Sequence, residues 1–410
     1  MHQEPIEICI VGGGFGGLYT ALSLSGRPAV RSGQWRITLI EPKDHFLFTP
    51  LLYELITGEL QRWEIAPSYR QLLAGTKIRW ENRACRAIDF PNRQVRLDDG
   101  ESVRYDYLVL AAGTRNRIPA IEGLAEHALT FRSLEDVERL QNTLHLLETE
   151  TRAPARVAVI GGGPNGVELA CKVADRLGDR GKVTLIERNS EILLNFSKGV
   201  RVASYRSLLA RDITLYLNTA LEKVTANSIV AVKGDIREIL DADLVIWTAG
   251  TEARDWIAAI DRPKNDRGQL FVRPTLQLLD DPEVFAVGDI AEIYGGKQRI
   301  PATAQAAYQA SAIVASNLVG AIEKRSLKTY RYLHLGDMLT LGRKRALVSS
   351  FGLNIGGRLA DITRRFVYIL RLPTKRQKIK VLQHWLKNIL LKFRYKRGIS
   401  RQPIESRNLR

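Results

Sequence analysis

The stretch EICIVGGGFGGLYTALSL, residues 7–24, decides the fold because it joins an apolar strand, a glycine-rich turn and the start of a helix. In such a turn one glycine permits the tight bend, a second lets the backbone approach a pyrophosphate, and a third allows close helix–strand packing. The helix N-terminus then faces the phosphate charge. We predict a strand at Ile6–Val11 and a helix at Leu18–Leu24. The dinucleotide cradle between them comprises Gly12, Gly14, Phe15, Gly16 and Gly17.

The strand that follows this cradle ends in an acid. RITLI, residues 36–40, is followed by Glu41, which lies 24 residues past Gly17. A carboxylate at this position can accept hydrogen bonds from a ribose 2′-OH. The glycine turn alone is a weak signal, whereas strand, glycines, helix, strand and acid together indicate a dinucleotide site.

The whole pattern occurs a second time in RVAVIGGGPNGVELACKV, residues 156–173, and its acid, Glu187, lies 21 residues past Gly166. The predicted elements are a strand at Val157–Ile160, a helix at Val167–Leu177 and a strand at Val183–Ile186. The turn residues are Gly161, Gly163, Pro164 and Gly166. A glycine-rich turn without a ligand is the alternative for either copy, and two complete copies argue against it.

The residue after Glu187 leaves the nicotinamide donor open. An acid at the strand end favours NADH, because a 2′-phosphate would meet a like charge. The neighbouring Arg188 either compensates that charge and admits NADPH or is a solvated residue at the strand end. Two cradles imply two dinucleotides, and the simplest chemistry for such a pair is hydride transfer from a nicotinamide to a flavin.

The positive charge of the chain is concentrated towards its C-terminal end. The 410 residues carry a net charge of +17. Residues 324–410 contain 23 Lys and Arg against 3 Asp and Glu, a net of +20, so the preceding residues carry −3. A charge block of this kind indicates an interaction surface for anionic lipid or nucleic acid. A chain of this length exceeds a single core, and two or three domains are expected.

Three cysteines, at positions 9, 85 and 171, lie far apart and form no C-x-x-C. They signal neither a redox dithiol nor a thiolate metal cluster, so we expect no metal site and small buried side chains at Cys9 and Cys171. The first strand begins by about residue 6, which leaves no room for a signal or transit peptide. No run of 18 apolar residues occurs, so we expect no spanning helix.

On these motifs the chain resembles the two-dinucleotide-binding-domain flavoproteins and, within them, the type II NAD(P)H:quinone oxidoreductases, which do not pump protons. The resemblance implies FAD in the first cradle and NADH or NADPH in the second. Three further segments carry it, in the right order and over nearly the whole chain. They are YDYLVLAAGTRNRIPAIEG (105–123), EVFAVGDIA (283–291) and IPATAQAAYQAS (300–311).

The first two of these segments resemble parts of the FAD site. The AAGT turn that follows a strand at Leu108–Ala111 resembles the family's domain crossover, and its lack of bulk lets a ligand approach. An ordinary strand-to-linker turn is the alternative. After a strand at Phe285–Val287, Asp289 resembles the acid that binds the ribityl–pyrophosphate region, and a helix N-cap is the alternative. The cofactor residues implied here are Ala112, Gly113, Thr114, Gly250, Gly288 and Asp289.

The third segment resembles the AQ-x-A-x-Q helix beside the flavin ring and the quinone site. Gln305 and Gln309 are four residues apart on a predicted helix, so both amides lie on one face and can hydrogen-bond flavin or quinone carbonyls. A solvated helix face is the alternative. The resemblance also places Thr303 and Ala304 against the cofactor.

Glu168 in GVELA resembles the family's glutamate that approaches the nicotinamide, or it simply favours a helix N-terminus. The segment PKDHFLFTPLLYELITGEL, residues 42–60, resembles the family's loop near the flavin and places Pro50 and Leu51 by the ring. His45 in this segment is either a proton donor to quinone or a structural histidine, and the structural role is the commoner one.

The electron acceptor that follows the flavin is inferred from the absence of cysteine motifs and from the basic C-terminal segment. Disulfide reductases need a C-x-x-C and sulfide:quinone reductases need paired cysteines, which leaves a quinone, an iron–sulfur protein or oxygen as acceptor. Two candidate amphipathic helices, 357–372 and 373–393, carry apolar residues at helical spacing among many Lys and Arg. Cationic amphipathic helices lie in a membrane interface. A dimer interface, a helix hairpin packed on the core and a nucleic-acid tail are the alternatives, and the apolar stripe argues against nucleic acid.

We therefore predict an α/β fold with two Rossmann-like dinucleotide-binding domains and a C-terminal amphipathic membrane-docking segment. The predicted ranges are 1–117 with 252–325 for FAD, 118–251 for NAD(P)H and 326–410 for the basic tail. The predicted activity is reduction of a membrane quinone by NAD(P)H, and the alternative is a soluble reductase of a ferredoxin-like carrier. The tail also resembles the cyanobacterial and plastid branch that reduces demethylphylloquinone or related prenyl quinones. The expected partners are a membrane quinone and anionic lipid on the cytoplasmic side of a membrane, which is a thylakoid or plasma membrane if the chain is cyanobacterial. A second copy of the chain is a candidate partner, and no nucleic acid is expected.

Overall fold

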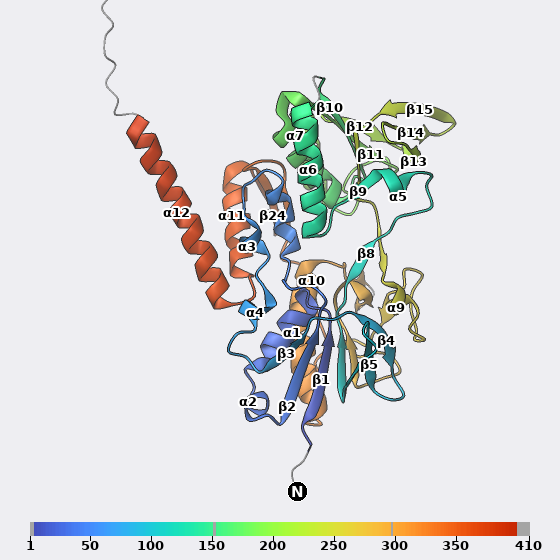
Figure 1. Ribbon diagram of the computed structural model, residues 1–410, viewed down its shortest axis with the longest axis vertical. Helices are drawn as coiled ribbons and strands as arrows, with labels where there is room; N and C mark the ends of the chain where they lie inside the picture. The colour runs from blue at the N-terminus through green and yellow to red at the C-terminus, as the bar shows by residue number, and fades with distance from the viewer. Residues whose placement is uncertain (1–3, 151–152, 297, 400–410) are drawn as a thin grey trace, which may run out of the picture. The chain divides into compact units, whose positions relative to one another are not determined.

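The computed structural model describes residues 4–150, 153–296 and 298–399. The chain divides into two compact units, residues 1–364 and 365–410, and the larger unit contains both glycine-rich cradles. Figure 1 shows the two main sheets of this unit, one around β1 and one around β10.

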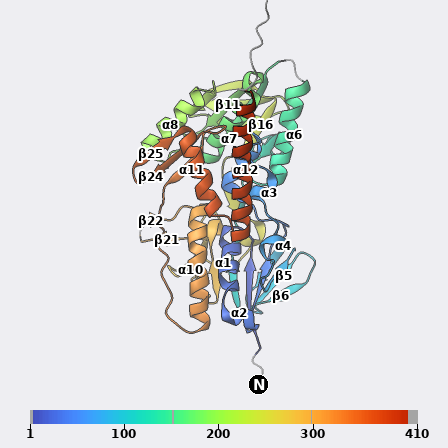
Figure 2. The same cartoon turned by 90° about the vertical axis from the view of Figure 1, so that its left-hand side faces the viewer.

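The first sheet is parallel throughout and has β1 at its centre, in the order β19-β7-β1-β2-β3. Its strands are β19 (Val284–Ala286), β7 (Tyr107–Leu110), β1 (Ile6–Val11), β2 (Trp35–Ile40) and β3 (Ile78–Glu81). Such strands are apolar in succession because helices cover both faces of a parallel sheet. Helix α1 (Phe15–Ser25) packs along α10 (Ala304–Ile322), and Figure 2 shows the two side by side.

The second sheet repeats this arrangement around β10, in the order β12-β11-β10-β16-β9, and is again parallel. Its strands are β12 (Thr214–Leu217), β11 (Gly181–Glu187), β10 (Ala155–Ile160), β16 (Leu244–Trp247) and β9 (Ala128–Thr130). Its helices are α6 (Leu134–Glu150), α7 (Pro164–Leu177) and α8 (Lys198–Leu209). The predicted pair of Rossmann-like sheets is confirmed.

The chain passes between the two sheets through a short antiparallel pair. The pair consists of β8 (Thr114–Asn116) and β17 (Thr251–Ala253). The indole N–H of Trp247 donates to the carbonyl of Arg117 at 2.8 Å, which fastens the end of the second sheet to this crossover. The domain ranges given above stay predictions.

In the described residues, three three-stranded antiparallel sheets and several short elements complete the fold. The small sheets are β4 (Cys85–Asp89), β5 (Gln94–Leu97) and β6 (Ser102–Arg104); β13 (Ala220–Val224), β14 (Ser228–Lys233) and β15 (Ile236–Asp241); and β23 (Asp337–Thr340), β24 (Ala346–Ser350) and β25 (Leu353–Gly356). The short elements are α2 (Pro28–Ser32), η1 (Thr49–Leu55), α3 (Arg62–Ile65), α4 (Tyr69–Leu72), α5 (Leu124–His127), η2 (Gly178–Arg180), α9 (Asp255–Ala258), β18 (Leu270–Phe271), η3 (Gly288–Ile290), β20 (Ala291–Glu292), β21 (Tyr294–Gly295) and β22 (Gln298–Arg299).

Both cradle helices begin earlier than predicted. Helix α1 starts at Phe15 because Gly14 is its extended N-cap, and α7 starts at Pro164 because proline fits the first position of a helix. The sheet β23–β25 was also missed. It occupies the first part of the region predicted as a tail and packs against α7 and α8.

The C-terminal part contains α11 (Gly357–Leu370) and α12 (Lys375–Ile399), close to the two predicted helices. Within the described ranges, no helix combines the length and the hydropathy that a membrane crossing requires. The three cysteines are free and buried, which confirms the expected role of Cys9 and Cys171 as packed side chains.

Candidate functional site

The first cradle has two kinds of glycine. A Cβ at Gly12, whose φ is +104°, would lie 2.4 Å from the carbonyl oxygen of Ala111, and one at Gly17 would lie 1.8 Å from that of Gly12. A Cβ at Gly14 would meet no heavy atom within 4 Å. The protein itself therefore requires glycine at positions 12 and 17, whereas Gly14 borders open space at the helix N-terminus. This is the geometry that a bound pyrophosphate needs.

A half-buried acid and a buried tyrosine hold this cradle in place. The carboxylate of Glu41 accepts the backbone N–H of Gly13 at 2.8 Å and that of Lys43 at 3.0 Å. The Tyr69 hydroxyl donates to the carbonyl of Gly13 at 2.7 Å. Burial, with the nearby carboxylate of Glu41, raises the pKa of Tyr69 well above its usual value, so its proton stays available for this bond. Glu41 thus lies at the edge of the cradle, where its predicted ribose contact requires it.

The second cradle repeats these features. Gly161 has φ of +114°, a Cβ at Gly166 would lie 1.8 Å from the carbonyl oxygen of Gly161, and one at Gly163 would meet open space. The buried carboxylate of Glu187 accepts the N–H of Gly162 at 2.6 Å and that of Asn189 at 2.8 Å. Arg188 is exposed beside them. The two copies are therefore alike in the glycines and in the position of the acid.

The predicted FAD residues around the crossover lie together. The Thr114 hydroxyl donates to the carboxylate of Asp289 at 3.2 Å. Arg132 donates to the same carboxylate at 3.1 Å and to the Thr114 hydroxyl at 2.9 Å. Asp289 lies inside η3, whose N-cap is Val287, so the alternative role of Asp289 as an N-cap is not observed. Positive φ angles of 62°, 83° and 82° occur in the surrounding turns, at Gly113, Gly250 and Gly288.

Arg132 was missed because it belongs to no glycine motif. It follows β9, on the NAD(P)H side of the crossover, and reaches Asp289 over 157 residues of chain. The positive charge of Arg132 suits a partner for the acid Asp289, but no motif or spacing in the sequence links these two positions.

The two predicted glutamines on α10 have protein partners. The side-chain oxygen of Gln305 accepts the hydroxyl of Tyr332 at 2.9 Å and the N–H of Leu335 at 3.0 Å. Gln309 binds the backbone of Leu333 twice, donating at 2.8 Å and accepting at 3.0 Å. Both amides therefore fasten residues 332–335 to α10, a role that sequence reasoning missed. Their contact with flavin or quinone stays a prediction, as does that of Ala304, which follows the N-cap Thr303.

Residues of the segment predicted to lie by the flavin surround the start of α1. Phe15 makes edge-to-face contacts with Phe46 and Phe48, each with ring centroids 5.2 Å apart. Leu51 is buried, and Pro50 accepts a hydrogen bond at its carbonyl oxygen from Arg364 at 2.6 Å. The segment 42–60 thus passes the start of α1 at the first cradle, and the position of Pro50 and Leu51 by the flavin ring stays a prediction.

His45, the candidate proton donor in this segment, is buried. Its Nδ1 lies 2.5 Å from a carboxylate oxygen of Asp44, and this bond lowers the pKa of Asp44. Its Nε2 is buried and has no hydrogen-bond partner among the residues that the structure describes. Both contacts fit a structural histidine, and its part in proton delivery stays untested.

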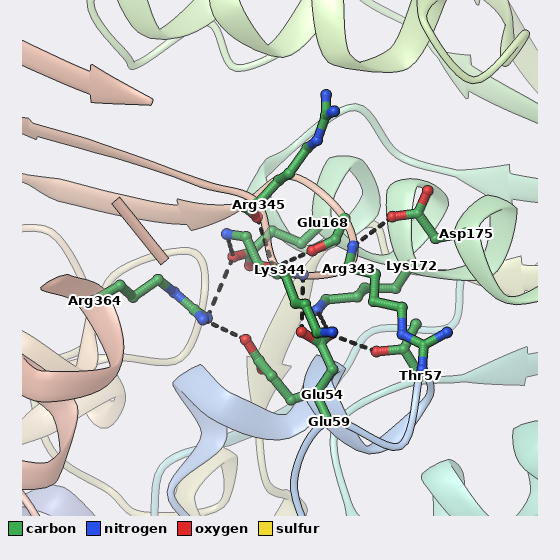
Figure 3. A network of polar contacts seen from close by, with 12 residues as sticks. Glu54, Thr57, Glu59, Glu168, Lys172, Asp175, Arg343, Lys344, Arg345 and Arg364 are labelled. Atoms are coloured by element: carbon green, nitrogen blue, oxygen red, sulfur yellow. Dashed lines mark hydrogen bonds and ion pairs between the residues drawn. The ribbon is translucent and has the colours of Figure 1, made fainter. Parts of the chain in front are cut away.

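Glu168 lies in a network of buried charges between α7, η1 and the region around β23 (Figure 3). Its carboxylate accepts the N–H of Thr340 at 2.7 Å and lies 3.9 Å from Arg364, which forms an ion pair with Glu54. Burial raises the pKa of Glu168 to about 7, although Arg364 and the Thr340 N–H oppose the rise. This acid can therefore hold or release a proton near neutral pH.

A second ion pair of the same network joins Lys172 to Glu59. Glu59 also accepts the N–H of Lys344 at 2.9 Å and the hydroxyl of Thr57 at 2.6 Å. The network was missed because its members are scattered along the chain, with no motif that marks them. Within the described part of the chain, no group of three metal-ligating side chains gathers.

These features define a class, an oxidoreductase with two dinucleotide cradles on two parallel sheets. The sequence profile of the pyridine nucleotide-disulphide oxidoreductases matches residues 6–311. The chain belongs to this family and, within it, to the type II NAD(P)H:quinone oxidoreductases. It departs from the disulphide reductases in lacking a C-x-x-C.

Named relatives support this assignment. The chain is 40% identical to demethylphylloquinone reductase NdbB of Synechocystis, over 94% of this chain and 97% of the relative. It is 34% identical to alternative NAD(P)H-ubiquinone oxidoreductase C1 of Arabidopsis thaliana, over 94% of this chain and 81% of the relative. NDH2 from Plasmodium falciparum, solved with NADH, has a TM-score of 0.83 at 19% identity, covering 94% of this chain and 98% of that one. At this identity the structure shows the common fold.

Proposed function

We propose that this protein reduces a membrane quinone with NAD(P)H through bound FAD. The net reaction is NAD(P)H + H⁺ + quinone → NAD(P)⁺ + quinol, which balances two electrons and two protons. The observation that carries the proposal is the pair of cradles, each with an open glycine at a helix N-terminus and, at the next strand end, an acid that accepts a backbone N–H of the glycine turn. The family relationship and the named relatives support the same reaction.

The residues present fit FAD in the first cradle and the nicotinamide in the second. Gly14 and Gly163 leave room for the pyrophosphates, and Glu41 and Glu187 lie where ribose hydroxyls are bound. When bound, FAD supplies the hydride acceptor that lets a two-electron donor reduce a quinone. The protein contributes mainly orientation, because no side chain needs to form a covalent bond. The two buried cysteines next to the cradles have pKa values that burial raises, which argues against a thiolate in the reaction.

We propose demethylphylloquinone or another prenyl quinone as the acceptor. The relative with 40% identity and nearly full coverage is named a demethylphylloquinone reductase. The quinone site that we propose lies beside Thr303, Gln305 and Gln309 at the start of α10. We infer NADH as the better donor. Two backbone N–H groups hold the Glu187 carboxylate at the place where the 2′-phosphate of NADPH would bind, and the two negative charges would repel each other.

Docking to anionic lipid on the cytoplasmic side of a membrane is the second part of the proposal. Large apolar side chains are exposed on the two C-terminal helices, among the basic residues. They are Leu359, Ile362, Phe366 and Leu370 on α11 and Ile379 and Leu386 on α12. The β24–β25 turn adds Phe351, 83% exposed, and Leu353. Each basic residue near an anionic surface contributes about 1 kcal/mol, so a net charge of +20 supports reversible, peripheral binding.

Two other roles for the apolar faces of these helices can be distinguished from lipid docking by experiment. A soluble reductase of a ferredoxin-like carrier would stay at the bottom of a liposome flotation gradient. A homodimer that uses these helices would show a doubled mass in solution and lose it when the apolar face is made polar. No contact in the described residues favours either reading.

The test of the proposed function is steady-state oxidation of NADH and NADPH by the purified yellow protein with a water-soluble naphthoquinone. Rapid turnover with quinone supports the proposal, and the ratio of the two donors shows the preference that Glu187 sets. Turnover with ferricyanide but not with quinone would overturn the quinone assignment and favour an electron-carrier reductase.

A further inference from the structure

Helix α7 of the second cradle carries three polar residues on the side that faces the segment 42–60. Asn165, Glu168 and Lys172 are spaced three and four positions apart, so they lie on one face of α7. Asn165 and Lys172 contact residues 53–59, which include the end of η1, and Glu168 is linked to Glu54 through Arg364. We call the contact between this face of α7 and residues 53–59 the α7 seam.

The contacts along the α7 seam run in order. The Tyr53 hydroxyl donates to the side-chain oxygen of Asn165 at 2.9 Å. One turn further, Glu168 approaches Arg364, which is paired with Glu54. At the far end of the seam, Lys172 is paired with Glu59 (Figure 3). The seam therefore joins a helix that starts at the nicotinamide cradle to the segment that carries Pro50.

The last pair is almost completely enclosed. The Lys172 side chain is 0% exposed and that of Glu59 is 3% exposed. Glu59 is held in addition by Thr57 and by the N–H of Lys344. A buried ion pair contributes little to net stability compared with apolar residues, but it fixes geometry because each charge tolerates few other positions. Neither residue belongs to a cradle, so the pair has no other assigned task.

We propose that Lys172 and Glu59 are positioning residues for hydride transfer, which set the distance between the nicotinamide side and the flavin side of the protein. This inference rests on the proposed function. Rates of transfer depend steeply on geometry, and a misplacement of about 1 Å can cost about 100-fold. The two residues act through α7 and η1 and touch no reacting atom themselves.

The experiment compares the holoenzyme with the variant Lys172→Met/Glu59→Leu. Removing both charges avoids leaving one of them buried and unpaired, which is the change most damaging to folding. Flavin bleaching is followed in single turnovers with NADH and with 4-deuterated NADH. We expect FAD retention and the Kd for NADH to be unchanged, bleaching to slow about tenfold or more, and the isotope effect to change.

The matched control is Arg176→Met/Glu148→Leu, which removes an ion pair from the same helix on its α6 side. The single variants Lys172→Met and Glu59→Leu complete a double-mutant cycle, in which a positioning pair gives a coupling in the bleaching rate. Wild-type bleaching and isotope effect in the double variant would overturn the proposal, as would loss of FAD in that variant alone. If NADH fails to bleach the wild-type flavin, the proposed function itself is wrong, and the two failures are distinguishable.

Discussion

Gly14 and Gly17 are three residues apart and have opposite surroundings, and this difference makes the first cradle testable. In Gly14→Val the side chain enters open space, so the fold is retained and the site of the pyrophosphate is filled. We expect a folded, colourless protein, measured by absorbance at the flavin band and by circular dichroism.

Gly17→Ala is the matching control for that variant. Its Cβ would lie 1.8 Å from the carbonyl oxygen of Gly12, so we expect loss of the fold as well as the cofactor. A yellow, fully loaded Gly14→Val would contradict the assignment of FAD to this cradle.

Glu187 gives a prediction about the choice of donor. Glu187→Gln removes the negative charge and keeps an oxygen acceptor for one of the two N–H groups, since Gly162 and Asn189 donate to different carboxylate oxygens. We expect the ratio of kcat/KM for NADH to that for NADPH to fall about tenfold, since repulsion of a 2′-phosphate is worth on the order of 1 kcal/mol at a partly solvated site. Arg188→Ala is the companion variant. An unchanged ratio in Glu187→Gln would mean that Arg188 or another residue sets the preference.

Glu168 gives a prediction about pH. Burial raises its pKa to about 7, against about 4.3 in an unfolded chain. The folded protein thus keeps a proton that the unfolded chain releases, so this contribution to stability is full below about pH 4 and is lost as the pH rises towards 7. The loss is on the order of 3 kcal/mol. Urea unfolding at pH 5 and pH 8 should show a smaller pH effect in Glu168→Gln, and equal effects in both proteins would refute the raised pKa.

At the scale of elements, the cradles could be predicted because their signals are local. Strand, glycines, helix and acid lie within about 40 residues of one another, and each has one physical meaning. The buried network could not be predicted, because Arg364 and Glu54 are 310 residues apart and carry no spacing that marks them. Arg364 instead fits the predicted basic face of an amphipathic helix. Its complete burial corrects that expectation at this position.

The glutamines on α10 show the same limit. Their shared face was predictable from helical spacing, but their partners at Tyr332, Leu333 and Leu335 depend on where the following segment returns. The sheet β23–β25 was missed because its strands are short and lie in a basic region that the charge count assigned to the tail.

The apolar face of α11 gives a prediction at this scale. The pair Leu359→Asp/Ile362→Asp places charges on two exposed apolar positions, which opposes burial in a membrane interface. We expect binding to anionic vesicles to fall at least about tenfold, measured by co-sedimentation. The control is Ile236→Asp/Ile239→Asp on β15, where two isoleucines are also exposed. Equal losses in both pairs would mean that α11 has no special part in docking.

For the whole molecule, the position of Arg364 decides where the tail can be cut. A deletion from Gly357 would remove Arg364 and leave Glu54 and Glu168 without their partner. A deletion of residues 373–410 keeps the buried pair and removes α12. We expect this truncated protein to keep NADH:ferricyanide activity and to lose most activity with quinone in vesicles.

Ionic strength provides the control for the truncation. Vesicle binding of the full chain should weaken as salt rises, because the net charge of +20 in residues 324–410 is screened over about 8 Å at physiological ionic strength. The truncated protein should show a smaller salt effect. Equal loss of both activities on truncation would instead assign the tail a structural role.

Because the three cysteines are buried, the native chain should react little with thiol-directed labels, and an introduced cysteine can be labelled selectively. Each thiol is enclosed, and burial raises the pKa of Cys85 to about 12 and that of Cys171 to about 11, so little thiolate is present for a maleimide to attack. A single cysteine introduced at Phe351 would then carry a fluorophore alone. A blue shift of that fluorophore on addition of vesicles would report, position by position, which part of the protein enters the lipid.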